Sequence, residues 1–308
     1  MFLKDAGLSV DLAGLRLINP TMLASGILGY SVEPLAEIAK RGCGGVVTKS
    51  VCLKPRIGYA NPTIVEAGVG LINAMGLPNP GIDEYAEELS EMKSTLPIPV
   101  VASVFGFSAA EYVAVSKKAV RAGVDGVELN VSCPHVRDTG SELGQDPLLL
   151  SEVVRAVKAA VDKPVLVKLT PNVTSVVELA RTAERDGADA LTIMNTVKAM
   201  AIDVETGMPI LANQVGGLSG PAVKPIAVRH VFDVYETVEI PILGCGGIGD
   251  WRDAVEFLLA GASAVQIGTA VAMRGVGVFG EVVRGIRTYM RKKGLRSVGE
   301  IVGLSHRR

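Results

Sequence analysis

One cysteine stands in a chemical neighbourhood that suits proton transfer. Cys133 lies in the segment 130–134, Asn-Val-Ser-Cys-Pro, which directly follows a short apolar run and begins a long loop. A thiol acts as a general base when its surroundings bring its pKa towards the working pH. His135 is a second candidate acid or base, although a loop histidine more often faces solvent. Cys133 is therefore a candidate catalytic base.

The other three cysteines lack such neighbours. Cys43, Cys52 and Cys245 are dispersed, without C-x-x-C spacing. Neither a disulfide framework nor an iron–sulfur or structural zinc site follows from this pattern. We expect reduced thiols that act as inert small hydrophobes, and no bound metal.

Two glycine-containing loops also suit ligand binding. Gly246-Gly247 and Gly268-Thr269 each follow a short apolar run. The segment 244–249, Gly-Cys-Gly-Gly-Ile-Gly, formally matches a dinucleotide fingerprint, but the acidic residue expected about 20 residues later is missing. In a barrel, the loops after the last two strands bind phosphate through backbone N–H groups, and the phosphate of FMN suits both loops. Tight turns that merely require glycine are the alternative for either loop.

Two lysines each end an apolar run and are expected to point into one site. Lys49 follows 45–48 and Lys168 follows 164–167. A desolvated ammonium needs an anion nearby. One such lysine could belong to a structural ion pair, but two at one mouth favour an anionic ligand and a reduced, anionic flavin ring. Such cations would stabilise the charge that develops as hydride arrives.

The elements that must position these residues alternate along the chain. Apolar runs predict strands at 21–24, 45–48, 100–104, 126–129, 165–168, 190–194, 242–245 and 264–267. Helical spacing of apolar residues predicts helices at 108–122, 147–161, 174–186, 223–235 and 250–259. This order favours a (β/α)8 TIM barrel with an N-terminal β-hairpin and long βα loops over the active site. An open doubly wound sheet has the same alternation of strands and helices and is the alternative.

Composition narrows the class of protein. The 308 residues are 48% hydrophobic, and no linker or compositional shift divides them, so we expect a single domain over 1–308. Lys plus Arg number 31 against 32 for Asp plus Glu, which does not favour a nucleic-acid partner. No apolar stretch approaches the roughly 20 residues of a membrane span. We therefore expect a cytoplasmic protein with a small-molecule ligand.

Taken together, these motifs resemble those of the class 1 dihydroorotate dehydrogenases over nearly the whole chain. The matching segments are 48–50 (Thr-Lys-Ser), 73–81 (Asn-Ala-Met-Gly-Leu-Pro-Asn-Pro-Gly), 130–134 (Asn-Val-Ser-Cys-Pro), 168–172 (Lys-Leu-Thr-Pro-Asn), 216–222 (Gly-Gly-Leu-Ser-Gly-Pro-Ala), 246–248 (Gly-Gly-Ile) and 268–269 (Gly-Thr). The resemblance implies FMN-dependent oxidation of (S)-dihydroorotate to orotate in pyrimidine biosynthesis. It implies that Cys133 removes the C5 proton while hydride passes from C6 to N5 of FMN; the membrane-linked class 2 enzymes carry serine instead.

The resemblance further implies two sets of contacts. Substrate contacts would come from Lys49, Asn73, Ala74, Met75, Gly76, Leu77, Asn130, Asn195 and Thr196. FMN contacts would come from Ser25, Lys49, Ser50, Asn130, Lys168, Met194, Gly220, Gly246, Gly247, Gly268 and Thr269. Two residues depart from the family pattern: His135 replaces an orotate-binding asparagine, and Ser103 replaces an FMN-contacting asparagine.

The loop after Cys133 bears on the electron acceptor. Residues 133–140 lack the Pro-Gly-Lys-Pro continuation associated with the fumarate-linked A type and look like the NAD-linked B type. That type implies a partner subunit carrying FAD and a [2Fe-2S] cluster, around a homodimer core of a heterotetramer. The alternatives are an A-type enzyme, another FMN barrel such as a dihydropyrimidine dehydrogenase-like reductase, and a non-catalytic barrel that binds a phosphate compound or serves as a scaffold.

Overall fold

Eight parallel strands close into a barrel in the computed structural model, which describes residues 7–131 and 144–307. The strands are β3 (Thr21–Leu23), β4 (Gly45–Val47), β7 (Val100–Val104), β8 (Gly126–Asn130), β9 (Val165–Lys168), β10 (Ala190–Ile193), β15 (Ile242–Cys245) and β16 (Ala264–Ile267). The ring closes where β16 pairs with β3, with Val265 opposite Thr21. This confirms the predicted (β/α)8 barrel and excludes the open sheet.

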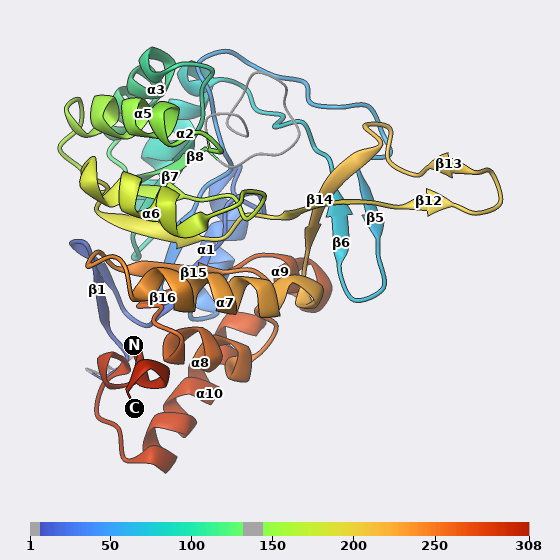
Figure 1. The fold of residues 1–308 in the computed structure, drawn as a ribbon. Coiled ribbons are helices and arrows are strands. Elements are labelled where there is room, and N and C mark those ends of the chain that lie inside the picture. Colours follow the sequence, from blue (N-terminus) through green and yellow to red (C-terminus); the bar gives the residue numbers. More distant parts are fainter. Residues whose placement is uncertain (1–6, 132–143, 308) are drawn as a thin grey trace.

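Helices cover the outside of the barrel (Figure 1). They are α1 (Val32–Lys40), α2 (Ile82–Thr95), α3 (Ala109–Arg121), α5 (Pro147–Lys158), α6 (Val176–Arg185), α7 (Lys224–Tyr235), α8 (Trp251–Leu259), α9 (Thr269–Arg274) and α10 (Val278–Lys293), with short 3-10 helices η1 (Pro221–Val223), η2 (Val298–Glu300) and η3 (Leu304–His306). Several begin slightly later than predicted because the first predicted residue is a cap. Ser108, for example, accepts the backbone N–H of Glu111 at 3.3 Å.

The predicted N-terminal hairpin closes one end of the barrel. It consists of β1 (Val10–Leu12) and β2 (Leu15–Leu17), paired in antiparallel. Its buried leucines form one apolar cluster with residues of the strand interiors. The members of this cluster are Leu12, Leu15, Leu17, Met22, Val47, Val101, Leu166, Ala190, Leu243 and Ala264.

A second interior layer lies two residues further along the strands and is largely polar. Successive side chains of a strand face opposite sides, so a residue two positions on faces the interior again. The buried residues at these positions are Ala24, Lys49, Ser103, Glu128, Lys168, Thr192, Cys245 and Gln266. The carboxyl-terminal half of the barrel interior is therefore built for polar contacts.

An arm of antiparallel strands projects beside the barrel (Figure 1). Its four-stranded sheet has the order β11 (Val197–Met200), β14 (Val215–Ser219), β6 (Leu71–Asn73) and β5 (Ile64–Glu66), and β12 (Ile202–Asp203) pairs with β13 (Met208–Pro209). These strands lie in the long loops predicted after β4 and β10. The sequence predicted the length of these loops but not their strands.

Within the described residues, no helix combines the length and apolar character needed to cross a membrane.

Candidate active site

A cavity of about 420 Å³ opens at the carboxyl ends of the barrel strands. Most of the residues expected to touch substrate or cofactor line it. These are Ser25, Lys49, Ser50, Asn73, Met75, Gly76, Leu77, Asn130, Lys168, Met194, Asn195, Thr196, Gly220, Gly246, Gly247, Gly268 and Thr269. The fold thus brings segments from the whole length of the chain to one ligand volume.

Two expected residues are not among these. Ala74 is fully buried and packs with Ile72 and Leu211 behind the cavity wall, so its side chain is not placed for substrate contact. Cys133, together with His135, lies outside the described residues. The position of Asn130 at the end of β8 still fixes where the segment that carries Cys133 leaves the barrel.

Lys168 forms part of the base of the cavity. Its ammonium donates to Gln266 Oε1 at 3.2 Å and to Ser25 Oγ at 3.3 Å, and lies 3.8 Å from a carboxylate oxygen of Glu128. Burial alone would lower the pKa of Lys168, but Cys245 and Glu128 outweigh this effect and raise the pKa above its ordinary value. The side chain is therefore a buried cation facing the ligand volume.

The thiol of Cys245 also lines the cavity, beside Lys168. Burial raises the pKa of this thiol, although Lys168 opposes the shift. A neutral thiol carries no charge, so we attribute the stabilisation of the Lys168 cation to Glu128. Cys43 and Cys52 are buried as well, and burial raises the pKa of the Cys43 thiol to about 12. Burial thus favours the neutral thiol at all three positions.

A hydrogen-bonded group connects the wall of the cavity to the strand behind it. Asn130 Nδ2 donates to Ser50 Oγ at 3.0 Å, and Ser50 Oγ lies 2.8 Å from Ser103 Oγ. Ser103 is fully buried behind Ser50. This residue, which departs from the family pattern, is thus placed to orient Ser50 rather than to touch a ligand.

Asn73, the residues 75–77 and the residues 195–196 also line the cavity. Gly76 and Leu77 both have positive φ, at 72° and 56°, which holds the loop in a sharp turn. Asn73 Nδ2 donates to Gly217 O at 3.3 Å and anchors the loop to β14. Lys49 is buried and lies under the ring of Tyr30, with 5.9 Å from its ammonium to the ring centre. Amide and ammonium groups are therefore available for a small polar ligand.

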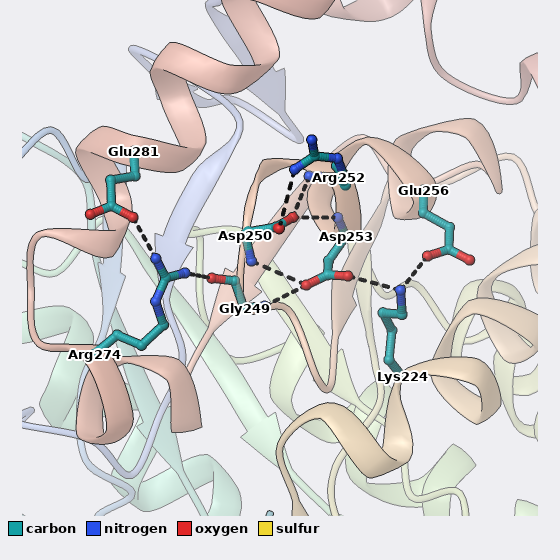
Figure 2. A network of polar contacts seen from close by, with 8 residues as sticks. All are labelled: Lys224, Gly249, Asp250, Arg252, Asp253, Glu256, Arg274 and Glu281. Atoms are coloured by element: carbon teal, nitrogen blue, oxygen red, sulfur yellow. Dashed lines mark hydrogen bonds and ion pairs between the residues drawn. The ribbon is translucent and has the colours of Figure 1, made fainter. Parts of the chain in front are cut away.

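The glycine loop after β15 is held by a network of charged side chains (Figure 2). Asp253 Oδ2 accepts the backbone N–H of Gly249 at 2.9 Å and of Asp250 at 3.1 Å. Lys224 Nζ donates to the other oxygen of Asp253 at 2.8 Å, and Arg274 donates to Gly249 O. The loop is therefore tied to α7, α8 and α9 together.

Glycine is sterically required in this loop. Gly246 and Gly247 have φ of 125° and 80°. A Cβ on Gly247 would lie 2.7 Å from Lys224 Cβ and 2.8 Å from Gly220 O. Both glycines line the cavity, and glycine backbone that faces a cavity suits the binding of a phosphate.

Sequence reasoning missed Glu128, Gln266 and Arg274. The first two are polar residues inside otherwise apolar strands, Gly-Val-Glu-Leu-Asn and Ala-Val-Gln-Ile, and this was the signal that would have found them. Arg274 lines the cavity from the end of α9, and no local motif marks it.

Comparisons with known proteins agree with the site. Residues 7–290 match the family profile described as Dihydroorotate dehydrogenase. The chain is 51% identical to the dihydroorotate dehydrogenase B (NAD(+)) catalytic subunit of Pyrococcus abyssi, over 97% of this chain and 99% of that protein. It is 50% identical to the protein of the same name from Methanothermobacter thermautotrophicus, over 97% and 98%, and 46% identical to that from Methanosarcina mazei, over 98% and 96%.

Proposed function

Because this chain belongs to the dihydroorotate dehydrogenase family, we propose that it oxidises (S)-dihydroorotate to orotate with FMN as resident cofactor, a step of pyrimidine biosynthesis. The observation that carries this function is the single cavity at the mouth of the barrel, where a buried cation, an amide-rich wall and the glycine loop meet. An aromatic ring, a phosphate and a small anionic substrate are the ligands that these three features suit.

The described residues fit FMN. The glycine loop offers backbone where a Cβ on Gly247 would collide with its neighbours, and Gly220, Gly268 and Thr269 line the same part of the cavity. These residues would hold the phosphate. Residues nearer the base of the cavity would hold the ring: Ser25, Lys49, Ser50, Asn130, Lys168 and Met194. When bound, FMN supplies a hydride acceptor, and it carries one more negative charge when reduced.

Polar residues that line the cavity would also bind dihydroorotate. Lys49 provides a cation for the substrate carboxylate. The amides of Asn73, Asn130 and Asn195 can both donate to the ring carbonyls and accept from the ring N–H groups. The loop 75–77 and Thr196 complete the enclosure, so the pyrimidine ring would be held flat and away from water.

We assign the proton transfer to Cys133. The thiolate takes the proton from C5 while the C6–H bond breaks and its electron pair leaves as hydride, so that a C5=C6 double bond forms. Oxidation therefore removes one proton and one hydride and needs no added reactant beyond FMN.

The electron acceptor and assembly form the second part of the proposed function. The relatives are named NAD(+)-linked catalytic subunits, which implies a further subunit for those proteins. For this chain we propose a partner carrying FAD and a [2Fe-2S] cluster, around a homodimer core of a heterotetramer, in the cytoplasm. The name of the relatives, dihydroorotate dehydrogenase B (NAD(+)), favours NAD+ over fumarate as the final electron acceptor.

An anaerobic absorption spectrum tests the substrate and the cofactor together. We expect one FMN per chain and loss of its yellow absorption when dihydroorotate is added. Bleaching by another dihydropyrimidine but not by dihydroorotate would reject the substrate. A protein that stays colourless after incubation with FMN would instead favour a barrel that binds another phosphate compound.

A further inference from the structure

A buried carboxylate lies directly behind the base of the cavity and has no part in the chemistry above. Glu128 is fully buried on β8, in the polar layer of the barrel interior. Its Oε2 accepts from Gln266 Nε2 at 2.6 Å and from Thr192 Oγ1 at 2.9 Å. Its Oε1 lies 3.8 Å from Lys168 Nζ and accepts no hydrogen bond from the described residues.

Gln266 connects this carboxylate to the lysine. The amide gives its Nε2 hydrogen to Glu128 and its Oε1 lone pair to Lys168, so one orientation of the amide serves both charges. Ser25 Oγ accepts from Lys168 at 3.3 Å on the side of the cavity. Lys168 is thus held between a ligand-facing hydroxyl and a buried anion.

Lys168 and Glu128 lie at different distances from a ligand in the cavity. Lys168 lines the cavity, whereas Glu128 lies behind it and reaches the ligand only through space. Buried charges are weakly screened and act over several ångströms. A negative charge gained in the cavity is therefore stabilised by Lys168 and opposed, to a smaller extent, by Glu128.

A purely structural ion pair would make closer contacts than this one. Burying two charges is costly, and it is repaid only when good geometry and further hydrogen bonds satisfy them. Here the closest approach is 3.8 Å, and one carboxylate oxygen has no described donor. The contacts of Glu128 therefore differ from the close, fully satisfied geometry that a purely structural ion pair needs.

Resting on the proposed function, we propose that Glu128 is a positioning residue that orients Lys168 and lowers the reduction potential of the bound FMN. Reduction by hydride adds two electrons and one proton, so the flavin gains one negative charge. Glu128 limits how strongly Lys168 favours that charge. The reduced flavin consequently releases its electrons more readily to an acceptor.

The test is the midpoint potential of the FMN-loaded protein, measured anaerobically by equilibration with a dye of known potential. In Glu128→Gln the side chain keeps its shape but loses its charge. We expect reduced FMN to bind at least about tenfold more tightly relative to oxidised FMN, which raises the potential by about 30 mV for a two-electron couple. Lys168→Met should shift the potential downwards.

Thr192→Val is the matched control. It removes one hydrogen bond to the same carboxylate and leaves the charge, so thermal stability should fall while the potential stays near that of the unmodified protein. An unchanged potential in Glu128→Gln would overturn the proposal and leave a structural pair. If that variant does not retain FMN, Glu128→Asp is measured instead, because it draws the charge back by one methylene. A smaller rise of the midpoint potential supports the proposal, and no rise overturns it.

This measurement is independent of the substrate. The dye reduces or oxidises the flavin without dihydroorotate, so a failure of the substrate assignment would leave the comparison of potentials intact.

Discussion

The carboxylate of Asp253 accepts the backbone N–H of Gly249 at 2.9 Å and so ties the glycine loop after β15 to the first turn of α8. The same carboxylate oxygen accepts the backbone N–H of Asp250, and the other carboxylate oxygen binds Lys224. The shape of the proposed phosphate site therefore depends on a residue that does not line the cavity.

Asp253→Ala should weaken FMN binding by about tenfold. The substitution frees two backbone N–H groups and leaves Lys224 without one of its two carboxylates, and a lost hydrogen bond of this kind costs about 1–3 kcal/mol. Titration of the apoprotein with FMN, followed by flavin fluorescence, measures the change. Asp233→Ala is the control, because Asp233 pairs with Arg229 at 3.1 Å on α7 rather than with the loop. Equal affinities in the two variants would contradict the role of Asp253.

The carboxylate of Asp253 should also make the stability of the fold depend on pH. Burial alone would raise the pKa of Asp253, but hydrogen bonds from Lys224, Gly249 and Asp250 hold the pKa below its ordinary value. A group with a lowered folded pKa stabilises the fold fully above its unfolded pKa, about 3.9 for aspartate, and loses this effect as pH falls through the folded value. The melting temperature of Asp253→Asn should thus lie below that of the unmodified protein near neutral pH, with the gap closing only below about pH 4. A gap that is constant down to pH 3 would show that charge is not involved.

Gly247→Ala tests the steric requirement of the loop. The new Cβ would meet Lys224 Cβ at 2.7 Å and Gly220 O at 2.8 Å, at a φ of 80° that costs a non-glycine residue about 1–3 kcal/mol. We expect at least tenfold weaker FMN binding in the same fluorescence titration. Gly277→Ala should bind FMN normally, since its Cβ would meet nothing within 4 Å and its φ is −62°. Normal binding by Gly247→Ala would mean that the loop relaxes without cost.

The barrel was predictable because its signals are local. Each strand is a short apolar run. The predicted helices show a 3.6-residue period, and some of them, as at Ser108, begin at a side-chain cap. The residues of the cavity follow from the same logic, since the residue after a barrel strand lies at the mouth whatever the neighbouring strands contain. Lys49, Asn130 and Lys168, expected at the mouth for this reason, line the cavity.

What could not be predicted depends on contacts between distant segments. Strand β6 pairs with β14, where Gly217 lies opposite Asn73, and the glycines of β14 give no alternating pattern. The side chain of Ala74 turns out to be buried because that pairing fixes its orientation. Glu128 stands out locally only as a polar residue in an apolar strand. Its contact with Gln266 joins the non-adjacent strands β8 and β16 across the barrel interior, and no local pattern indicates it.

Cys133→Ser should slow the reduction of FMN by dihydroorotate near neutral pH. A serine hydroxyl ionises far less readily than a thiol near neutral pH, so almost none of the ionised base is present, and general-base assistance contributes about 10²- to 10⁴-fold. Stopped-flow absorbance under anaerobic conditions gives the rate, and FMN and orotate affinities measured in parallel should stay unchanged. Cys52→Ala is the control, because Cys52 is buried beside Asn79 rather than in the cavity. Reduction at the unmodified rate in Cys133→Ser would remove this residue from the mechanism.

The isolated chain should oxidise dihydroorotate with an artificial acceptor and reduce NAD+ poorly or not at all. The segment 244–249 resembles a dinucleotide fingerprint, but its residues line the proposed FMN cavity and are tied down by Asp253, so no separate nicotinamide site arises from them. The remaining cysteines Cys43, Cys52 and Cys245 are buried and separate, whereas a [2Fe-2S] cluster usually needs four thiolates together. We therefore expect electrons to pass from FMN to a docked partner before they reach NAD+. Turnover of the purified chain with NAD+, fumarate and a dye, compared side by side, measures this requirement. Efficient reduction of NAD+ by the single chain would remove the need for a partner, and efficient reduction of fumarate would identify an A-type acceptor instead.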